Sequence, residues 1–406
     1  MERPVGRIWP LGSGFRIARS LRGIQRETAF GELHSEFVAG SHRRMVPTLG
    51  GKEEFAQRSR PEPACRNLFG GVLILGPKSL VLSFCNRRRL AAFCAVVALL
   101  CSSVLWSQPA PPQPGPYKVL TIERTVLHDP ARDKDILIKI YYPDGRGPFP
   151  VIIFSHGALA SKDAYFALGQ FWASHGYVCI HPSHSDSIAD YGFRGTVRQA
   201  ISDPQGWENR PKDISFILDS LPRVRSFAPP LAGKLDLRHI GVGGHSFGAY
   251  TASLTGGTDI LLPGKDRPQS FLDRRVSAVV MLSPQGEGIM GLSPNSWDEL
   301  RLPMLLMFGS RDFGPFDQPA KWRSEPFAKA PPTGNKYEVE IAGAKHMDFT
   351  GPAACGEATD EVFQTVEQET LAFWNAYLKQ DRQALQYLTS QRLQQAGGQA
   401  DRFLSK

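Results

Sequence analysis

The stretch Gly241–Tyr250 constrains the fold of this chain more than any other. It contains the run Gly244-His245-Ser246-Phe247-Gly248, a single Gly-x-Ser-x-Gly motif. The residues before it, Leu237–Gly243, predict a short buried strand, and the small residues after it predict a helix packed closely on a sheet. A strand, a sharp turn and a helix form a nucleophile elbow, which exposes a serine hydroxyl. An ordinary glycine-rich turn with an inert serine is the alternative.

Strand and helix patterns alternate from residue 117 to residue 390. Two alternating segments, 117–126 and 135–142, predict an antiparallel hairpin at the start. Short apolar runs predict further strands at 151–154, 177–180, 276–282, 304–308 and 337–341. Apolar residues at helical spacing predict helices over 163–175, 207–221 and 359–380. This alternation predicts an α/β fold with a mostly parallel central sheet and helices on both faces.

A serine nucleophile needs a base, and the base needs an acid that orients it. His346 follows the last predicted strand, and Asp312 directly follows the strand over 304–308. The order Ser246, Asp312, His346 is the order of the α/β-hydrolases. Asp317, Glu287 and Asp348 remain rival acids.

The predicted reaction also needs two backbone N–H donors for a negatively charged oxygen. One is the N–H of Phe247, directly after the serine. The loop after the strand over 151–154 reads Phe154-Ser-His-Gly157-Ala158, and we assign the second donor to Ala158. His156 is expected to hold this loop by a hydrogen bond.

These motifs resemble the platelet-activating-factor acetylhydrolase and dienelactone-hydrolase-like branch of the α/β-hydrolases. The resemblance covers roughly residues 117–380. It is carried by Phe154-Ser-His-Gly157, Ala173-Ser-His-Gly-Tyr177, the segment 210–219, Gly244-His-Ser-Phe-Gly248 and His346. It implies a serine esterase for short or compact carboxylic esters.

Two departures from this family narrow the expectation. Dienelactone hydrolases use a cysteine nucleophile, whereas position 246 is serine. In the acetylhydrolases the acid follows the strand after the elbow helix, but here Ser283-Pro284-Gln285 follows Leu282. A lipase or polyester hydrolase, an acetylhydrolase-like phospholipid deacetylase and a non-catalytic binding protein on the same fold remain alternatives.

Three loops at the predicted catalytic edge carry candidate substrate-binding residues, namely His184, Trp297 and Phe316. His181 and His184 lie three residues apart on a loop without an obvious third ligand, so we expect no metal. We also expect no cofactor. If the protein is exported, a disulfide between Cys179 and Cys355 is possible, but it is not predicted because the sequence does not give the separation of the two Cα atoms.

The basic charge of the chain is concentrated at its N-terminus. Residues 1–90 hold 16 Lys and Arg against 7 Asp and Glu, and the remaining residues hold 31 against 32. The predicted catalytic domain over 117–390 is therefore near neutral, and we expect no nucleic-acid partner. Residues 1–85 are interpreted as a disordered or non-native extension.

Arg87-Arg-Arg89 precedes the apolar run Leu90–Trp106, which is typical of a signal peptide or membrane anchor over 86–108. A proline-rich linker, 109–116, follows, and 391–406 is expected to be a polar, frayed tail. We therefore expect export to the periplasm or the medium. Membrane contact would occur through residues 90–106 if they are retained. The partner is expected to be a small ester, and the oligomeric state stays open.

Overall fold

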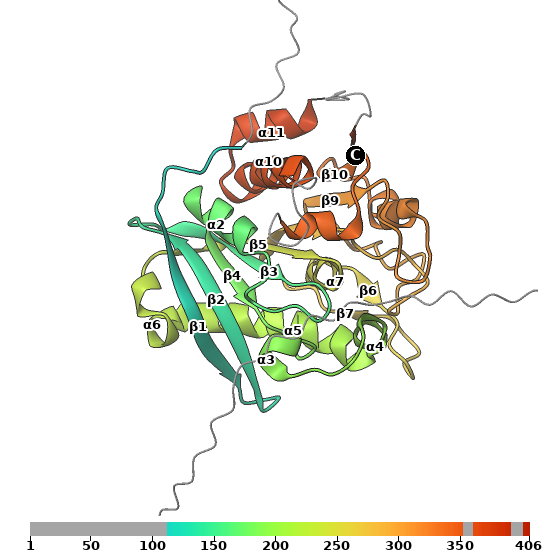
Figure 1. Cartoon of the computed structure of the whole chain (residues 1–406), viewed down its shortest axis with the longest axis horizontal. Helices are drawn as coiled ribbons and strands as arrows, with labels where there is room; N and C mark the ends of the chain where they lie inside the picture. The colour runs from blue at the N-terminus through green and yellow to red at the C-terminus, as the bar shows by residue number, and fades with distance from the viewer. Residues whose placement is uncertain (1–111, 352–359, 391–400) are drawn as a thin grey trace, which may run out of the picture. The chain divides into compact units, whose positions relative to one another are not determined.

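The computed structural model describes residues 112–351, 360–390 and 401–406. Within these residues, one large sheet has the strand order β1-β2-β4-β3-β5-β8-β9-β10-β11 (Figure 1). Its strands are β1 Val119–Asp129, β2 Lys134–Pro143, β3 Phe149–Ser155, β4 Val178–Pro182, β5 Leu235–His245, β8 Val276–Leu282, β9 Met304–Gly309, β10 Lys336–Ile341 and β11 Arg402–Ser405.

The six strands β4, β3, β5, β8, β9 and β10 run parallel to one another. Strands β3, β4 and β9 are buried along their whole length, which explains why their sequences are continuous apolar runs rather than alternating ones. The antiparallel pair β1 and β2 confirms the predicted hairpin. β2 then pairs antiparallel with β4 and so attaches the hairpin to the parallel strands.

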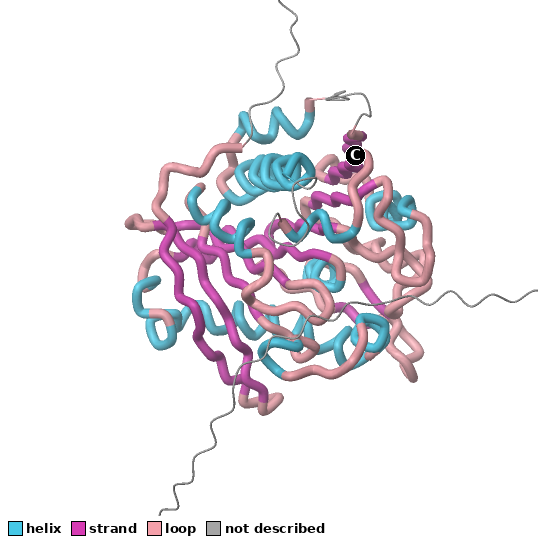
Figure 2. Tube along the Cα trace, in the orientation of Figure 1, coloured by secondary structure: helices cyan, strands magenta, loops and turns pink. Residues whose placement is uncertain are grey.

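Helices cover both faces of the sheet, as Figure 2 shows. They are α2 Phe166–Ser174, α3 Ile188–Tyr191, α4 Val197–Ser202, α5 Pro204–Ser220, α6 Val224–Phe227, α7 Phe247–Thr255, α8 Glu325–Lys329, α10 Asp360–Leu378 and α11 Arg382–Thr389. Short 3₁₀ turns are η1 Leu221–Arg223, η2 Pro229–Leu231, η3 Ala320–Ser324 and η4 His346–Thr350. Strands β6 Asp259–Ile260 and β7 Gln269–Ser270 form a small separate ribbon.

Each face of the sheet has its own apolar core. The core on one face joins the strands to α5 and α7, and the core on the other joins them to α2 and α10. Trp374 of α10 is fully buried and lies directly over Gly241 of β5, where an added Cβ would approach the indole to 2.5 Å. The glycine therefore lets α10 pack closely on the sheet. The predicted α/β fold with helices on both faces is confirmed.

The predicted helices are real, but their ends differ from the sequence patterns. α5 begins at Pro204 because Asp203 caps it by accepting the Gln205 N–H and proline suits the first helical position. α2 begins only at Phe166, because Tyr165 has a left-handed φ of 58°. Capping and backbone strain of this kind are not visible in apolar periodicity.

The expectation that 391–406 is a frayed tail is wrong at its far end. Residues 402–405 form β11, which pairs antiparallel with β10 at the edge of the sheet. The Phe403 ring packs on Tyr337 at 6.1 Å between centroids, and Leu404 packs against the opposite core. A four-residue strand gains its stability from this tertiary contact, so its sequence alone carried little signal.

Several expectations lie outside the described residues. These are the extension over 1–85, the signal peptide or anchor over 86–108, and Cys355. Cys179 lies fully buried in β4 as a free thiol. In the described part of the chain, no helix combines the length and apolarity needed to cross a membrane.

Candidate active site

Ser246 lies at the turn between β5 and α7. Its backbone has φ 55° and ψ −119°, which is a strained conformation for a residue with a side chain. A Cβ on Gly244 would lie 2.2 Å from the backbone of Gly248, and a Cβ on Gly248 would lie 1.9 Å from the Ser155 carbonyl oxygen. Only glycine fits at both positions, and the Ser246 N–H donates to the Leu282 carbonyl at 2.9 Å. The predicted elbow geometry is therefore present.

The structure brings together the three side chains that the sequence singled out. His346 Nε2 lies 2.9 Å from Ser246 Oγ, and His346 Nδ1 lies 2.9 Å from Asp312 Oδ1. Ser246 follows β5, Asp312 follows β9 and His346 follows β10, so all three come from the carboxyl ends of parallel strands. The imidazole is about one-third exposed, whereas the Asp312 carboxylate is fully buried.

Asp312 is held by more than the histidine. Ser283, the first residue after β8, donates its hydroxyl to Asp312 Oδ2. The buried Arg323 contacts Asp312 Oδ1 at 2.6 Å and donates to the Ser283 and Pro284 carbonyls. Burial would raise the pKa of the Asp312 carboxyl, but His346, Arg323 and Ser283 together hold that pKa below its usual range. The carboxylate therefore stays ionised.

The rival acids have other surroundings. Glu287 pairs with Lys329, and Asp348 accepts the backbone N–H of Lys345. Asp317 lies in the loop after Asp312 with a left-handed φ of 65°. Among these four carboxylates, Asp312 is the one that contacts the His346 ring.

The loop after β3 lies beside Ser246 and is fixed from behind by Arg210 of α5. Arg210 is almost fully buried and donates to the carbonyl oxygens of His156 at 2.7 Å and Gly157 at 3.4 Å. It also pairs with Asp186, which accepts the Leu159 N–H at 3.0 Å. Arg210 and Asp186 thus hold this loop from the side of α5, because Arg210 binds two of its carbonyls and Asp186 accepts one of its amides.

Arg210 also touches the side chain of Phe247, whose backbone N–H is the other predicted donor. Its guanidinium carbon lies 4.0 Å from the centroid of the Phe247 ring. Phe247 is the first residue of α7, and the N–H groups of a first helical turn have no acceptor within the helix. One buried cation thus contacts both segments that carry the predicted donors, the loop at Ala158 and the start of α7.

A second Ser–His–Asp arrangement lies behind this loop. His184 Nε2 is 2.9 Å from Ser155 Oγ, and His184 Nδ1 is 2.9 Å from Asp213 Oδ2. All three residues are fully buried. Burial, with the charge of Arg210 second, lowers the pKa of His184 to about 4. The prediction that His184 binds substrate is therefore wrong, because the side chain braces the core beneath the loop.

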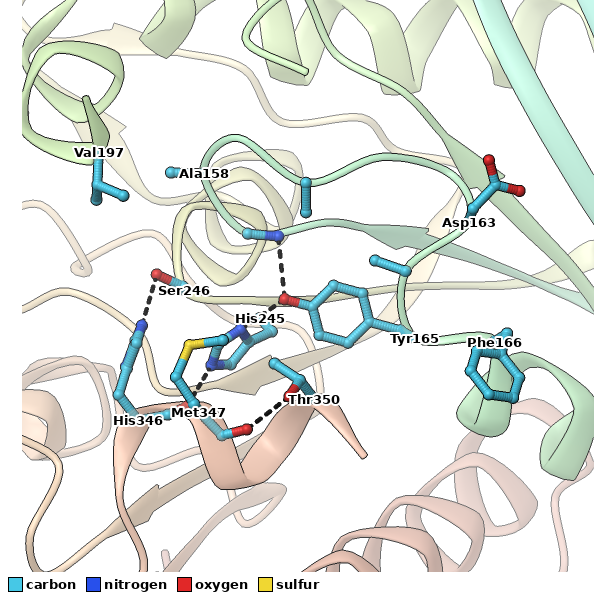
Figure 3. Close-up of a pocket in the computed structure, with 13 residues that line it drawn as sticks. Ala158, Asp163, Tyr165, Phe166, Val197, His245, Ser246, His346, Met347 and Thr350 are labelled. Carbon is cyan, nitrogen blue, oxygen red and sulfur yellow. Dashed lines mark hydrogen bonds between the residues drawn. The ribbon is translucent and has the colours of Figure 1, made fainter. Parts of the chain in front are cut away.

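A pocket of about 370 Å³ lies in front of Ser246 and His346 (Figure 3). Phe166, Val197 and Met347 give it an apolar, largely exposed rim, and Tyr165 and Ala158 line its interior. Trp297 is 1% exposed in the core and does not line this pocket, so its predicted role is also wrong. Phe316 is not a lining residue either, and the Arg198 guanidinium covers its ring at 4.8 Å. The sequence missed the rim because its residues come from separate elements, namely the first residues of α2 and α4 and the turn η4.

No group of three or more His, Cys, Asp or Glu side chains that could hold a metal occurs among the described residues. His181 packs edge-on against Tyr141, and His184 is engaged with Ser155 and Asp213. The two histidines therefore do not form a pair of ligands on one loop.

The fold and the arrangement of Ser246, Asp312 and His346 are those of an α/β-hydrolase. A family model described as Chlorophyllase matches residues 113–255. Chlorophyllase-1, chloroplastic, of Citrus sinensis is 27% identical over 135 residues, which are 33% of this chain and 36% of that protein. The match thus spans about a third of the relative's length.

These comparisons support the α/β-hydrolase superfamily but not the acetylhydrolase and dienelactone hydrolase branch expected from the motifs. The matched region includes the loop at Ala158 and the elbow at Ser246. It ends before Asp312 and His346, so the geometry of those two residues rests on the structure alone.

The buried histidines predict an acid-labile fold. Burial lowers the pKa of His181 and His184 to about 4, against 6.5 for a free histidine. Between these pH values the unfolded chain binds more protons, so stability is complete above pH 6.5 and is lost as the pH falls. We expect the unfolding free energy to drop by about 1.4 kcal/mol per pH unit for each such histidine.

Urea denaturation at pH 7, 6 and 5 measures this slope. His181→Gln removes one titrating group. The slope of the unfolding free energy against pH is therefore expected to fall by about 1.4 kcal/mol per pH unit. Equal slopes in the variant and the wild type would contradict the assignment.

Proposed function

We propose that this protein is a serine hydrolase that cleaves carboxylic esters through an acyl-enzyme. The observation that carries the proposal is the continuous hydrogen-bonded series from Ser246 Oγ through His346 to Asp312 at the wall of an apolar pocket. The likeness to the chlorophyllase family supports ester hydrolysis in general but points to no particular ester.

In this mechanism His346 Nε2 takes the proton of Ser246 as Oγ attacks the ester carbonyl carbon. The resulting imidazolium is stabilised by the buried Asp312 carboxylate, which accepts from Nδ1. His346 then gives the proton to the leaving alcohol, and an acyl-enzyme remains on Ser246. Water attacks the acyl-enzyme with His346 again as the base, which releases the acid and restores the serine.

The tetrahedral intermediates carry a negative oxygen that needs fixed donors. We assign these to the backbone N–H groups of Ala158 and Phe247. Losing one such donor typically lowers turnover by roughly 10²–10³. The buried Arg210 contacts both segments, and its contacts support a preorganised site.

The pocket supports a compact or short acyl group as substrate. Alanines 158, 160 and 164 line it together with the apolar rim of Phe166, Val197 and Met347. The exposed rim also suits a larger apolar ester, so a lipase or polyester hydrolase is the second candidate. An acetylhydrolase-like phospholipid deacetylase and a non-catalytic binding protein stay as further outcomes of the tests below.

Ser246→Ala is expected to abolish hydrolysis of p-nitrophenyl acetate and butyrate, because no other group takes over as nucleophile. A fluorophosphonate probe is expected to label the wild-type protein and not the variant. Circular dichroism and the melting temperature serve as the folding control. If the wild-type protein neither reacts with the probe nor hydrolyses these esters, the alternative of a non-catalytic binding protein is favoured.

Asp312→Asn is expected to lower turnover on the order of 10⁴ by analogy with other serine triads, because the neutral amide no longer fixes the histidine tautomer. Asp317→Asn is the matched control, since it makes the same change five residues away in the same loop. If the control loses activity and Asp312→Asn keeps it, Asp317 is the acid.

A panel of esters is expected to show highest kcat/KM for acyl chains of two to four carbons, because the pocket is small. The panel runs from p-nitrophenyl acetate to palmitate and adds a short-acyl phospholipid, a polyester film and chlorophyll. Chlorophyll is included because the curated relative is named a chlorophyllase. Maximal activity on palmitate or film would favour the lipase or polyester hydrolase instead.

A further inference from the structure

A series of hydrogen bonds joins the loop at Gly157 to the backbone of His346, through two side chains that the mechanism above does not use (Figure 3). The Gly157 N–H donates to the Tyr165 hydroxyl at 3.3 Å. Tyr165 Oη lies 2.7 Å from His245 Nδ1, and His245 Nε2 lies 2.9 Å from the His346 carbonyl oxygen.

The direction of every bond in this series follows from its last acceptor. A carbonyl oxygen only accepts, so His245 Nε2 carries a proton and donates it to His346. Nδ1 of the neutral ring is then an acceptor, and the Tyr165 hydroxyl must donate to it. The same hydroxyl oxygen is left to accept the Gly157 N–H. The donors and acceptors are thus fully matched.

Both side chains keep this protonation state. Burial raises the pKa of the Tyr165 phenol. Burial and the neighbouring His346 ring hold the pKa of His245 well below its usual range, with Arg323 acting in the same direction and Asp312 against it. Both shifts keep the Tyr165 phenol protonated and the His245 ring neutral near pH 7, which favours a positional role for this pair.

The local backbone also points to a positional role. Tyr165 has a left-handed φ of 58°, which a non-glycine residue adopts only at some energetic cost. A Cβ at position 157 would lie 2.9 Å from the Tyr165 hydroxyl, so the loop needs Gly157 for this contact. The His245 and His346 rings pack at 4.7 Å between centroids. The strained backbone and the close contacts therefore lie at one place, the junction formed by Gly157, Tyr165, His245 and His346.

We propose that Tyr165 and His245 are positioning residues that fix the loop bearing the Ala158 donor relative to the general base His346. This inference rests on the proposed function. His245 directly precedes the nucleophile, so the pair joins three parts of the site that lie on different strands. A loosened junction misplaces the donor and the base in the transition state more than it weakens substrate binding.

Tyr165→Phe removes only the hydroxyl. We expect kcat for p-nitrophenyl butyrate to fall roughly 10-fold or more with KM nearly unchanged, because small displacements of catalytic groups cost about that much. Tyr191→Phe is the matched control, since its hydroxyl also accepts a backbone N–H, from Leu137, and donates to a carbonyl, of Asp135. The control is expected to keep the wild-type kcat.

His245→Gln and the double variant complete a double-mutant cycle. If the two residues act as one unit, the double variant loses less than the product of the two single losses. A wild-type kcat in Tyr165→Phe, or an equal loss of kcat in Tyr191→Phe, would overturn the proposal.

A second readout does not depend on activity. In protein labelled with ¹⁵N-histidine, His245 is expected to remain the neutral Nε2–H tautomer from pH 5.5 to 8, and its Nδ1 resonance is expected to shift in Tyr165→Phe. A protonated His245, or an unchanged Nδ1 resonance, would overturn the proposed contacts. A wild type that neither labels with the probe nor hydrolyses esters would instead refute the proposed function.

Discussion

The close approach of three backbone segments at Gly244, Gly248 and Ser155 is the constraint on which the rest of the site depends. No Cβ fits at either glycine, because the first turn of α7 lies directly on the ends of β5 and β3. This packing holds Ser246 in a conformation that an unconstrained serine avoids. It also fixes the loop after β3 beside the serine. The elbow therefore places the nucleophile and the predicted oxyanion donors together.

Two Ser–His–Asp arrangements have the same hydrogen-bond distances but different surroundings. Ser155, His184 and Asp213 are fully buried, and burial holds the His184 ring neutral. Ser246 and His346 line a pocket, and the His346 ring is partly exposed. A nucleophile acts only where substrate and water reach it. Access therefore decides which set is a candidate for chemistry and which one supports the loop.

The Asp312 carboxylate is held by residues that follow the strands on either side of β9. Ser283, the first residue after β8, donates its hydroxyl to Asp312 after β9. Arg323 contacts the same carboxylate and the carbonyls of Ser283 and Pro284. The acid is thus held by Ser283 after β8, by His346 after β10 and by Arg323 of η3. Arg210 likewise holds the loop after β3 by donating to the His156 carbonyl.

The sequence by itself determined the α/β fold, the elbow at Ser246, and Asp312 and His346 as residues at strand ends. These features depend on periodicity and motifs among consecutive residues, which the chain shows directly. The burial of His184 and Trp297, the choice of Asp312 over three rival acids, the strand over 402–405 and the junction of Gly157, Tyr165, His245 and His346 came only from the tertiary structure. Each of these depends on contacts between residues far apart in the chain, and such contacts are set by how the layers pack.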